Sequence, residues 1–300
     1  MIQVKRVSSL RSAVSAARKE RKTIGFVPTM GNLHEGHLEL VRVAKSRCEY
    51  VVVSIYVNPT QFGANEDLEA YPHTPEEDAR QLAELDVDVL FLPTQEVMYP
   101  SALEDQTVVY VPKLGVDYCG KDRPEHFQGV TTVVARLFNM VIPDVAVFGM
   151  KDYQQLAIIK RMVRDLAYPI QIVGVDTVRN SDGLALSSRN GYLTEAELAT
   201  APLFRAALVS LAKQIGNAYI QQDLRLDAIE KFIKGAKANL VEAGFKPNYL
   251  AVCDQLNLEV PQFDSQGVYD TDLVILGSAT LGKARLIDNL EVDLKQAKNQ

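Results

Sequence analysis

The stretch TIGFVPTMGNLHEGHL, residues 23–38, begins as an apolar run and passes through a turn between two glycines into a helical pattern that extends to about Arg47. A strand that leads through a tight turn into a helix is the first part of a parallel β-α-β unit. Gly31 and Gly36 allow the backbone to turn tightly and to approach a ligand that a Cβ would block. This order of elements predicts an α/β protein.

The alternation of strand and helix continues outward from this stretch. Runs rich in β-branched residues recur, with helical patterns between them, at residues 23–27, 50–57, 87–92, 144–148 and 169–175. The uninterrupted run of Val51, Val52 and Val53 suits a strand that is buried on both faces. We therefore expect a Rossmann-like parallel sheet with helices on both faces, and ligands beyond the carboxyl ends of its strands.

A different pattern begins after residue 177. Two long helical stretches, near residues 195–215 and 224–243, are followed by short strands near 249–254, 273–276 and 286–290. This pattern predicts a smaller C-terminal α+β domain, so we assign residues 1–177 to the first domain and residues 178–300 to the second. Before the first strand, five apolar residues form one face of an expected helix: Val4, Val7, Leu10, Val14 and Ala17.

Composition narrows the class of function. The 300 residues are 47% hydrophobic and 23% charged, which is ordinary for a globular protein, and the net charge of -6 argues against nucleic acid as a partner. Three scattered cysteines (Cys48, Cys119 and Cys253) suggest neither a disulfide framework nor a zinc cluster. No apolar stretch approaches the roughly 20 residues that cross a bilayer. We expect a cytoplasmic enzyme that acts on small molecules and does not associate with membranes.

Two of the four histidines lie in the opening stretch. His34 and His37 are three residues apart at the start of the expected helix, so both imidazoles lie on one side, beside its exposed amides and the positive end of its dipole. Such a place suits phosphate. The spacing differs from the H-E-x-x-H pattern of zinc enzymes, and the stretches at residues 31–38 and 277–284 lack parts of a Walker phosphate loop. We therefore expect neither a metal cage nor a P-loop.

Four more segments are unusually polar for places where strands should end. They read NPTQF at residues 58–62, RPEHFQG at 123–129, GMKDYQQ at 149–155 and SSRN at 187–190. Their amides, hydroxyls and cations suit a polar anionic substrate and a triphosphate. Each segment alone is also compatible with an ordinary capped loop. Together they predict a binding site.

Seven strings, which lie in order from about residue 24 to 290, resemble the pantothenate synthetase family. They are P-T-M-G-x-L-H-x-G-H, S-I-[FY]-V-N-P-x-Q-F, Y-P-x-T-x-x-x-D, R-P-x-H-F-x-G-V, F-G-x-K-D-x-Q-Q, D-G-L-A-x-S-S-R-N and R-L-I-D-N, and they begin at Pro28, Ser54, Tyr71, Arg123, Phe148, Asp182 and Arg285. The resemblance implies a nucleotidyltransferase that condenses (R)-pantoate with β-alanine at the expense of ATP. It also implies that the reaction passes through an enzyme-bound pantoyl-adenylate, gives pantothenate, AMP and diphosphate, and is the last step of pantothenate biosynthesis.

The resemblance also implies roles for individual residues. Catalysis would fall to His34, His37, Lys151, Ser187, Ser188 and Arg189, which stabilise the phosphates of ATP, with the Ser-Ser-Arg segment closing over the nucleotide from the second domain. The ATP-binding residues would be Met30, Gly31, His37, Gly149, Lys151, Asp152, Val178, Leu186, Ser187, Ser188 and Arg189. Pantoate would bind to Gln61, Gln155 and Met30, and less defined positions in the cleft would be Asn58, Tyr71, Arg123 and His126.

Further expectations come from the same resemblance. Mg²⁺ would accompany ATP, held mainly by its phosphates and by water, and the chain would form a homodimer. The base that deprotonates β-alanine stays open among solvent, released phosphate groups and His34. The chain departs from the family's usual residues at five variable positions, with Asn32, His73, Glu125, Met150 and Leu186. These departures remove none of the proposed phosphate or pantoate contacts.

Three alternatives remain to be weighed against this function. A related nucleotidyltransferase could transfer a nucleotide onto a phosphate instead, although Gln61 and Gln155 favour a carboxylate substrate. A tRNA-charging enzyme would need a module with a basic face, which the length and the acidic balance do not provide. A silent binding protein could keep the fold, but it would have no need for His34, His37 or Lys151.

Overall fold

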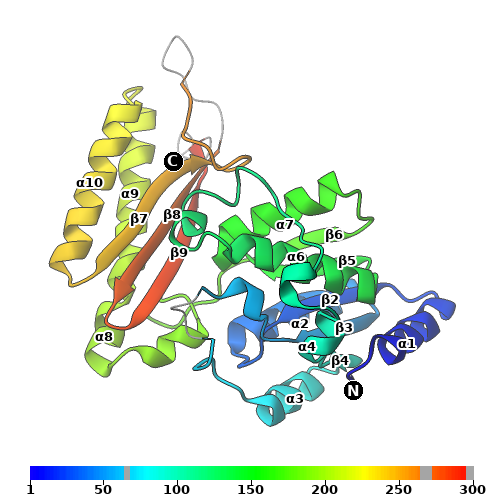
Figure 1. Ribbon diagram of the computed structural model, residues 1–300. Helices are drawn as coiled ribbons and strands as arrows, with labels where there is room; N and C mark the ends of the chain where they lie inside the picture. The colour runs from blue at the N-terminus through cyan, green and yellow to red at the C-terminus, as the bar shows by residue number, and fades with distance from the viewer. Residues whose placement is uncertain (64–67, 264–271, 295–300) are drawn as a thin grey trace. The chain divides into compact units, whose positions relative to one another are not determined.

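The expected alternation of strands and helices is present in the computed structural model, which describes residues 1–63, 68–263 and 272–294 (Figure 1). The chain divides into two units. The larger unit holds Met1–Met150 and Gln154–Val178, and the smaller unit holds Lys151–Tyr153 and Arg179–Gln300. Continuity of the sequence alone would place Lys151–Tyr153 in the first domain. That the smaller unit acts as a lid stays a prediction.

The larger unit is built on a six-stranded parallel sheet with the strand order β1-β4-β3-β2-β5-β6. Its strands are β1 (Ile2–Val4), β2 (Ile24–Thr29), β3 (Tyr50–Ile55), β4 (Val89–Phe91), β5 (Val145–Gly149) and β6 (Gln171–Val175). The chain runs outward from β2 to β3 and β4 and later returns to the other side of β2 as β5. The neighbours β2 and β5 therefore mark a topological switch point, where ligands of such sheets bind.

Helices and short 3-10 turns connect these strands. They are α1 (Val7–Lys19), α2 (Glu35–Arg47), η1 (Pro59–Gln61), α3 (Pro75–Glu84), α4 (Gln95–Met98), η2 (Leu103–Asp105), α5 (Cys119–Asp122), α6 (His126–Val141), η3 (Met150–Asp152) and α7 (Tyr153–Asp165). None of the helices formed by the described residues has the length and apolar character that crossing a bilayer requires.

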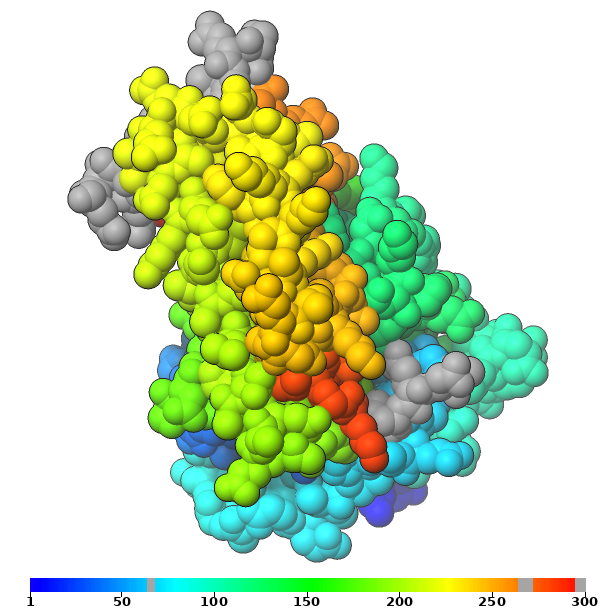
Figure 2. Space-filling view, turned by 90° about the vertical axis from the view of Figure 1, so that its left-hand side faces the viewer, coloured from blue at the N-terminus to red at the C-terminus, as the bar shows by residue number. Residues whose placement is uncertain are grey.

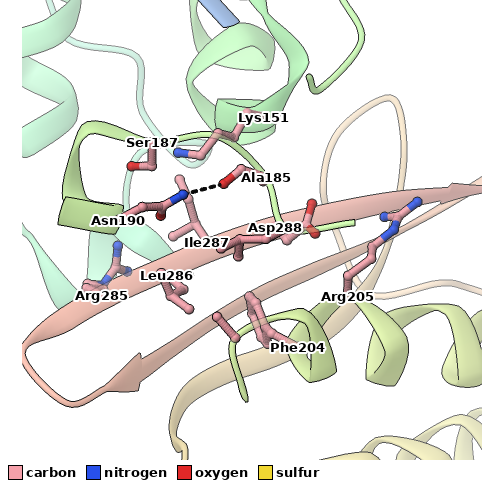
Figure 3. A pocket seen from close by; sticks show the side chains of 12 residues that line it. Lys151, Ala185, Ser187, Asn190, Phe204, Arg205, Arg285, Leu286, Ile287 and Asp288 are labelled. Atoms are coloured by element: carbon pink, nitrogen blue, oxygen red, sulfur yellow. Dashed lines mark hydrogen bonds between the residues drawn. The ribbon is translucent and has the colours of Figure 1, made fainter. Parts of the chain in front are cut away.

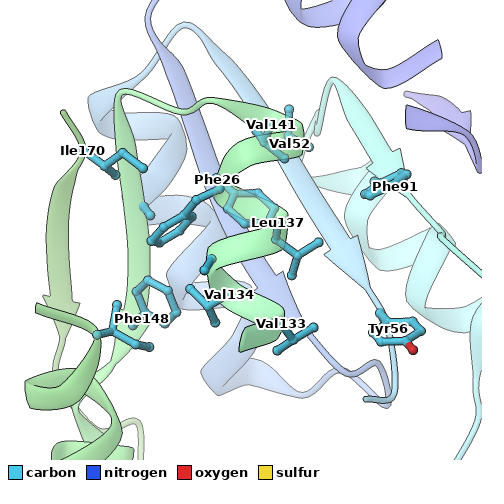
Figure 4. Close-up of a cluster of buried hydrophobic side chains, with 14 of the residues drawn as sticks. Phe26, Val52, Tyr56, Phe91, Val133, Val134, Leu137, Val141, Phe148 and Ile170 are labelled. Atoms are coloured by element: carbon cyan, nitrogen blue, oxygen red, sulfur yellow. The ribbon is translucent and has the colours of Figure 1, made fainter. Parts of the chain in front are cut away.

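The sheet is covered on both faces, and alternate residues of each central strand enter different cores. Phe26 and Val52 pack with α1 and α6 on one face, whereas Val27 and Val53 pack with α2 and α3 on the other. Figure 4 shows the first core, where α6 lies across the strands and presents its apolar side to Phe26. This packing confirms the two-sided burial that the run of valines predicts.

The smaller unit has an antiparallel sheet with the order β7-β8-β9 and helices packed against it. Its elements are η4 (Ser188–Tyr192), α8 (Glu195–Thr200), α9 (Pro202–Ile220), α10 (Leu226–Glu242), β7 (Lys246–Asp254), β8 (Leu273–Leu281) and β9 (Ala284–Val292). In Figure 2, α9 and α10, in yellow-green and yellow, form a broad face, and β9, in red, is seen over only a small area.

The fold class is confirmed, with differences at element boundaries. Val4 belongs to β1, which pairs with β4, and not to the first helix as expected. The helical stretch near residues 195–215 is two helices, because Pro202 lacks the N–H needed inside a helix and instead begins α9. Gly282 and Lys283 form the turn of the β8-β9 hairpin, which confirms that residues 277–284 are not a P-loop.

Candidate active site

The candidate residues of the larger unit follow the carboxyl ends of its central strands. Residues 30–37 follow β2, residues 58–61 follow β3, and Gly149 ends β5. Strands β2 and β5 are the neighbours at the switch point, so the segments after them meet where a doubly wound sheet binds its ligands. A side chain added at Gly149 would meet no protein atom within 4 Å, so its α-carbon faces open space.

The turn between β2 and α2 is held by a buried carboxylate. Asp78, in α3, accepts hydrogen bonds from the backbone amides of Asn32 and Leu33, both at 2.9 Å, and from the hydroxyl of Thr74 at 3.0 Å. Gly31 has φ +83°, and a Cβ there would lie 2.9 Å from the side chain of Ile55. The turn therefore needs both a glycine and an acceptor from another helix.

Asp78 was not predicted as a site residue. Its signal in the sequence is the spacing of Thr74 and Asp78, four residues apart, which places the hydroxyl and the carboxylate on adjacent turns of one helix end. The partners in the β2-α2 turn are 45 and 46 residues away, so no local pattern connects them.

The two histidines cap the first turn of α2 with their own rings. The Nδ1 atom of His34 accepts from the backbone amide of Gly36 at 3.1 Å, and the Nδ1 atom of His37 accepts from the amide of His34 at 3.3 Å. A neutral imidazole has one N–H, so an accepting Nδ1 leaves the proton on Nε2. Both rings thus present an Nε2–H donor. Their centroids are 4.1 Å apart, at the positive end of the helix dipole.

Gly36 makes room for this arrangement. A Cβ at this position would lie 2.9 Å from Cε1 and 3.0 Å from Nδ1 of His34. The glycine of the H-x-G-H string is therefore required by the ring of His34 and not by an unusual backbone angle. Val178 closes the same turn, with its Cβ 4.0 Å from the position of a Cβ on Gly36.

Gln61 is buried in a network that joins η1 to neighbouring segments. Its Nε2 donates to the sulfur of Met30 at 3.0 Å, and its Oε1 accepts from Asn58 at 3.3 Å. Asn58 also donates to the carbonyl of Gly129 at 3.2 Å and accepts from the hydroxyl of Tyr99 at 2.8 Å. Burial raises the pKa of the Tyr99 hydroxyl, which keeps its proton for this bond.

Arg123 and His126 hold the main chain of Gln61. The carbonyl of Gln61 accepts from Nδ1 of His126 at 2.8 Å and from Nη2 of Arg123 at 3.2 Å, while Nη1 of Arg123 donates to Nε2 of His126 at 3.1 Å. Gly129 allows the same approach, since a Cβ there would lie 2.3 Å from the carbonyl oxygen of Thr60. The R-P-x-H-F-x-G string therefore supports the segment that carries Gln61.

The adjacent glutamines of α7 have different surroundings. Gln154 is buried, and its amide bonds to three backbone groups, the carbonyls of Leu114 and Asp117 and the amide of Cys119. Gln155 is half-buried, and within the described residues its amide has no hydrogen-bond partner. Gln154 is thus occupied by the protein, which leaves Gln155 as the glutamine suited to a ligand.

The other expected residue of the larger unit packs against an aromatic ring. Tyr71 is 5% exposed, and its ring meets that of Phe62 edge to face, with centroids 5.9 Å apart.

The smaller unit carries the expected cationic residues and hydroxyls, of which Lys151 and Ser187 line a hollow. Lys151 and Asp152 lie in η3, Leu186 and Ser187 precede η4, and Ser188 and Arg189 begin it. The hydroxyl of Ser187 caps η4 by accepting from the amide of Arg189 at 3.3 Å. In Figure 3 the amine of Lys151 points toward the side of the hollow where Ser187 lies.

The hollow is small. Its volume is about 10 Å³, which is the lower limit for one water molecule. Its lining residues are Lys151, Leu184, Ala185, Ser187, Asn190, Ala201, Phe204, Arg205, Arg285, Leu286, Ile287 and Asp288. Burial lowers the pKa of the Arg205 guanidinium, and the nearby carboxylate of Asp288 offsets only part of this effect. Within the described residues, no group of three or more histidine, cysteine or acidic side chains is placed to hold a metal ion.

Comparison with known proteins assigns the chain to a family. The family model described as Pantoate-beta-alanine ligase matches residues 2–291. The chain belongs to this family.

Relatives named pantothenate synthetase are similar over nearly the whole chain. Pantothenate synthetase of Pseudomonas putida (strain W619) is 53% identical over 296 residues, which cover 99% of each chain. The enzyme of Shewanella baltica (strain OS223) is 51% identical over 293 residues, which cover 98% of this chain and 100% of the relative.

Solved structures of this family share the fold. Pantothenate synthetase from Thermus thermophilus has a TM-score of 0.85 at 43% identity and covers 97% of this chain and 99% of its own. Pantoate-beta-alanine ligase from Francisella tularensis, complexed with Beta-gamma ATP and Beta-alanine, has a TM-score of 0.73 at 32% identity and covers 97% of both chains.

The contacts of Asp78 generate a prediction about stability. In Asp78→Asn an amide N–H₂ replaces one of the two oxygens that accept from the backbone of the β2-α2 turn, so one buried donor loses its acceptor. We expect the free energy of unfolding, measured by urea denaturation, to fall by about 1–3 kcal/mol. The control is Asp86→Asn, which makes the same change at an exposed residue. Equal stability of the two variants would contradict the role given to Asp78.

Proposed function

We propose that the chain catalyses the ATP-dependent condensation of pantoate with β-alanine to give pantothenate, AMP and diphosphate. The observation that carries this proposal is the pair of histidines at the start of α2. Their Nδ1 atoms accept from the main chain, so two Nε2–H donors stand at the N-terminus of a helix. The substrates follow from the family to which the chain belongs. The paired donors suit a phosphate ligand such as ATP.

The first half-reaction needs stabilisation of negative charge. An oxygen of the pantoate carboxylate attacks the α-phosphorus, the bond from that phosphorus to the bridging oxygen breaks, and diphosphate leaves with the electron pair. His34 and His37 would donate to the phosphates as charge moves to the leaving group. Catalysis of this kind is chiefly positioning and electrostatic stabilisation by fixed donors.

The smaller unit would supply the cations for the same ATP. Lys151 and Arg189 carry the positive charges, and Ser187 and Ser188 carry hydroxyl donors. Closure of this unit over the nucleotide would protect the acyl-adenylate from water. We assign adenine and ribose recognition to Gly149, Asp152, Val178 and Leu186, supported by the open space beside Gly149.

Pantoate would be bound by neutral amides. Gln61 and Gln155 can donate to its carboxylate or hydroxyls without holding the nucleophile in a tight ion pair. Asn58 and the sulfur of Met30 contact the amide of Gln61, which fixes its orientation. Arg123 and His126 hold the main chain of Gln61 in place, because both donate hydrogen bonds to its carbonyl.

In the second half-reaction the free amine of β-alanine attacks the acyl carbon of the adenylate. The new C–N bond forms as the bond from the acyl carbon to the AMP oxygen breaks, and AMP leaves with the electron pair. The amine must first lose the proton that its ordinary pKa keeps at neutral pH, and the attacking nitrogen loses a second proton as the amide forms. Both protons would pass to solvent or to released phosphate groups.

Three further assignments are part of the proposal. Mg²⁺ would enter with ATP, held by phosphate oxygens and water, where it would neutralise phosphate charge. The enzyme would form a homodimer, as closed symmetric oligomers are common. It would act in the cytoplasm on small molecules alone, a role that suits a net charge of -6 and three cysteines scattered along the sequence.

The test is diphosphate release from ATP and pantoate, measured with and without β-alanine. We expect multiple turnover only with both substrates, and pantothenate and AMP as products. His37→Ala removes one fixed donor and should lower the rate by about 10²–10³. The control, His73→Ala, changes an exposed histidine and should leave the rate unchanged. Turnover without pantoate, or equal turnover without β-alanine, would contradict the proposed substrates.

Gly36→Ala separates the position of His34 from the stability of the helix. Alanine favours a helix over glycine by about 1 kcal/mol, yet the new methyl group would press on the ring of His34. We expect an unchanged or higher melting temperature with a rate lowered by about 10².

The matched control is Gly235→Ala in α10, where an added Cβ meets nothing within 4 Å. It should keep full activity and gain similar stability. Full activity of Gly36→Ala would show that the placement of the His34 ring is not needed for the reaction.

A further inference from the structure

Strand β9 carries two consecutive polar side chains that are almost fully buried. Asp288 is 5% exposed and Asn289 is 8% exposed. A buried polar group destabilises a protein unless it finds a partner. Each of these side chains finds its partner in a segment that carries groups proposed to bind the phosphates of ATP.

Asp288 lies on the face of β9 that packs into the core, the same face as Leu286 and Leu290. It forms a two-point ion pair with Arg179, with distances of 2.7 Å from Nη1 to Oδ2 and 2.8 Å from Nη2 to Oδ1. The side chains are 3% and 20% exposed, so water screens the pair weakly. Such a fork fixes the orientation of the guanidinium as well as its position.

Arg179 is the base of a short hairpin that leads to Ser187. Arg179 and Ala185 form an antiparallel bridge, and Nη1 of Arg179 donates to the carbonyl of Gly183 at 3.1 Å. Beyond the hairpin, the amide of Asn190 donates to the carbonyl of Ala185 at 3.0 Å. The segment that holds Ser187, Ser188 and Arg189 is therefore tied at both ends to a hairpin that Asp288 anchors.

Asn289 and Glu291 lie on the opposite face of β9 and hold a different segment. The Nδ2 atom of Asn289 donates to the carbonyl of Lys151 at 2.9 Å, and the hydroxyl of Tyr153 donates to Oε1 of Glu291 at 2.9 Å. Burial raises the pKa of the Tyr153 hydroxyl well above its usual range, so it stays a donor. These two contacts join Lys151 and Tyr153 to β9 within the smaller unit. The carbonyl of Asn289 in turn accepts from Arg205 at 2.8 Å.

We infer that Asp288 and Asn289 are positioning residues, which present the Ser187–Arg189 segment and Lys151 from one strand. Asp288 acts through Arg179 and the hairpin, and Asn289 acts on the main chain of Lys151. The spacing between the two groups of phosphate donors is then set by β9 before ATP arrives. This inference rests on the proposed function, in which these donors bind ATP.

The test compares Asn289→Ala and Asp288→Asn with the wild-type enzyme in the diphosphate-release assay. Asn289→Ala removes the donor to Lys151, and Asp288→Asn removes the charge that faces Arg179. We expect KM for ATP to rise and kcat to fall in both, so that kcat/KM for ATP drops about tenfold or more. KM for pantoate should stay within about twofold, because Gln61 and Gln155 belong to the larger unit.

The matched control is Asn248→Ala, which removes an exposed amide on β7 of the same sheet. It should leave all three constants unchanged. Should Asp288→Asn fail to fold, Arg179→Lys takes its place, because it keeps the charge but cannot form the fork. It should show the same rise in KM for ATP.

The constants separate positioning from a merely structural role. A variant that only reduces the folded fraction lowers kcat and leaves both KM values unchanged, and that result would overturn the inference. So would a value of kcat/KM for ATP within twofold of wild type in both variants. An inactive wild-type enzyme would instead contradict the proposed function, so the two failures are distinguishable.

Discussion

Two hydrogen bonds in the first turn of α2 are the constraint on which the candidate site depends. The amides of Gly36 and His34 donate to the Nδ1 atoms of His34 and His37, so the helix uses the rings as caps and leaves their protons on Nε2. The arrangement requires a glycine at residue 36 and a turn held by Asp78. The strand order, which places β2 beside β5 at the switch point, puts this turn at the edge of the sheet where ligands bind.

Much of the fold could be predicted because its signals are local. The central strands are runs of β-branched residues, and their lack of alternation indicates burial on both faces, as Val51, Val52 and Val53 illustrate. Strand β1 was missed because it is short and exists only through its pairing with β4, which is far away in the sequence. Pro202 indicates the break between α8 and α9. The break was missed because the apolar periodicity of this stretch does not show it.

The site was predictable where residue types and spacing act within one turn. His34, Gly36 and His37 are of this kind. Sequence patterns did not indicate Asp78, Asp288 and Asn289, because each contacts a residue far away in the sequence. Their partners lie 46, 109 and 138 residues away. Arg123 and His126 were expected in the site, but their bonds to the main chain of Gln61 appear only in three dimensions. Sequence patterns therefore predict the donors better than the groups that hold them.

In the proposed function the caps of α2 present two Nε2–H groups to the phosphates of ATP. Nitrogen NMR of ¹⁵N-histidine-labelled protein at about pH 8, where an ordinary imidazole is neutral, tests it directly. We expect an unprotonated Nδ1 and a protonated Nε2 in both rings. We also expect ATP to shift the Nε2 signals of His34 and His37 but not those of His73. A proton on Nδ1 of either ring, or no response of either ring to ATP, would contradict it.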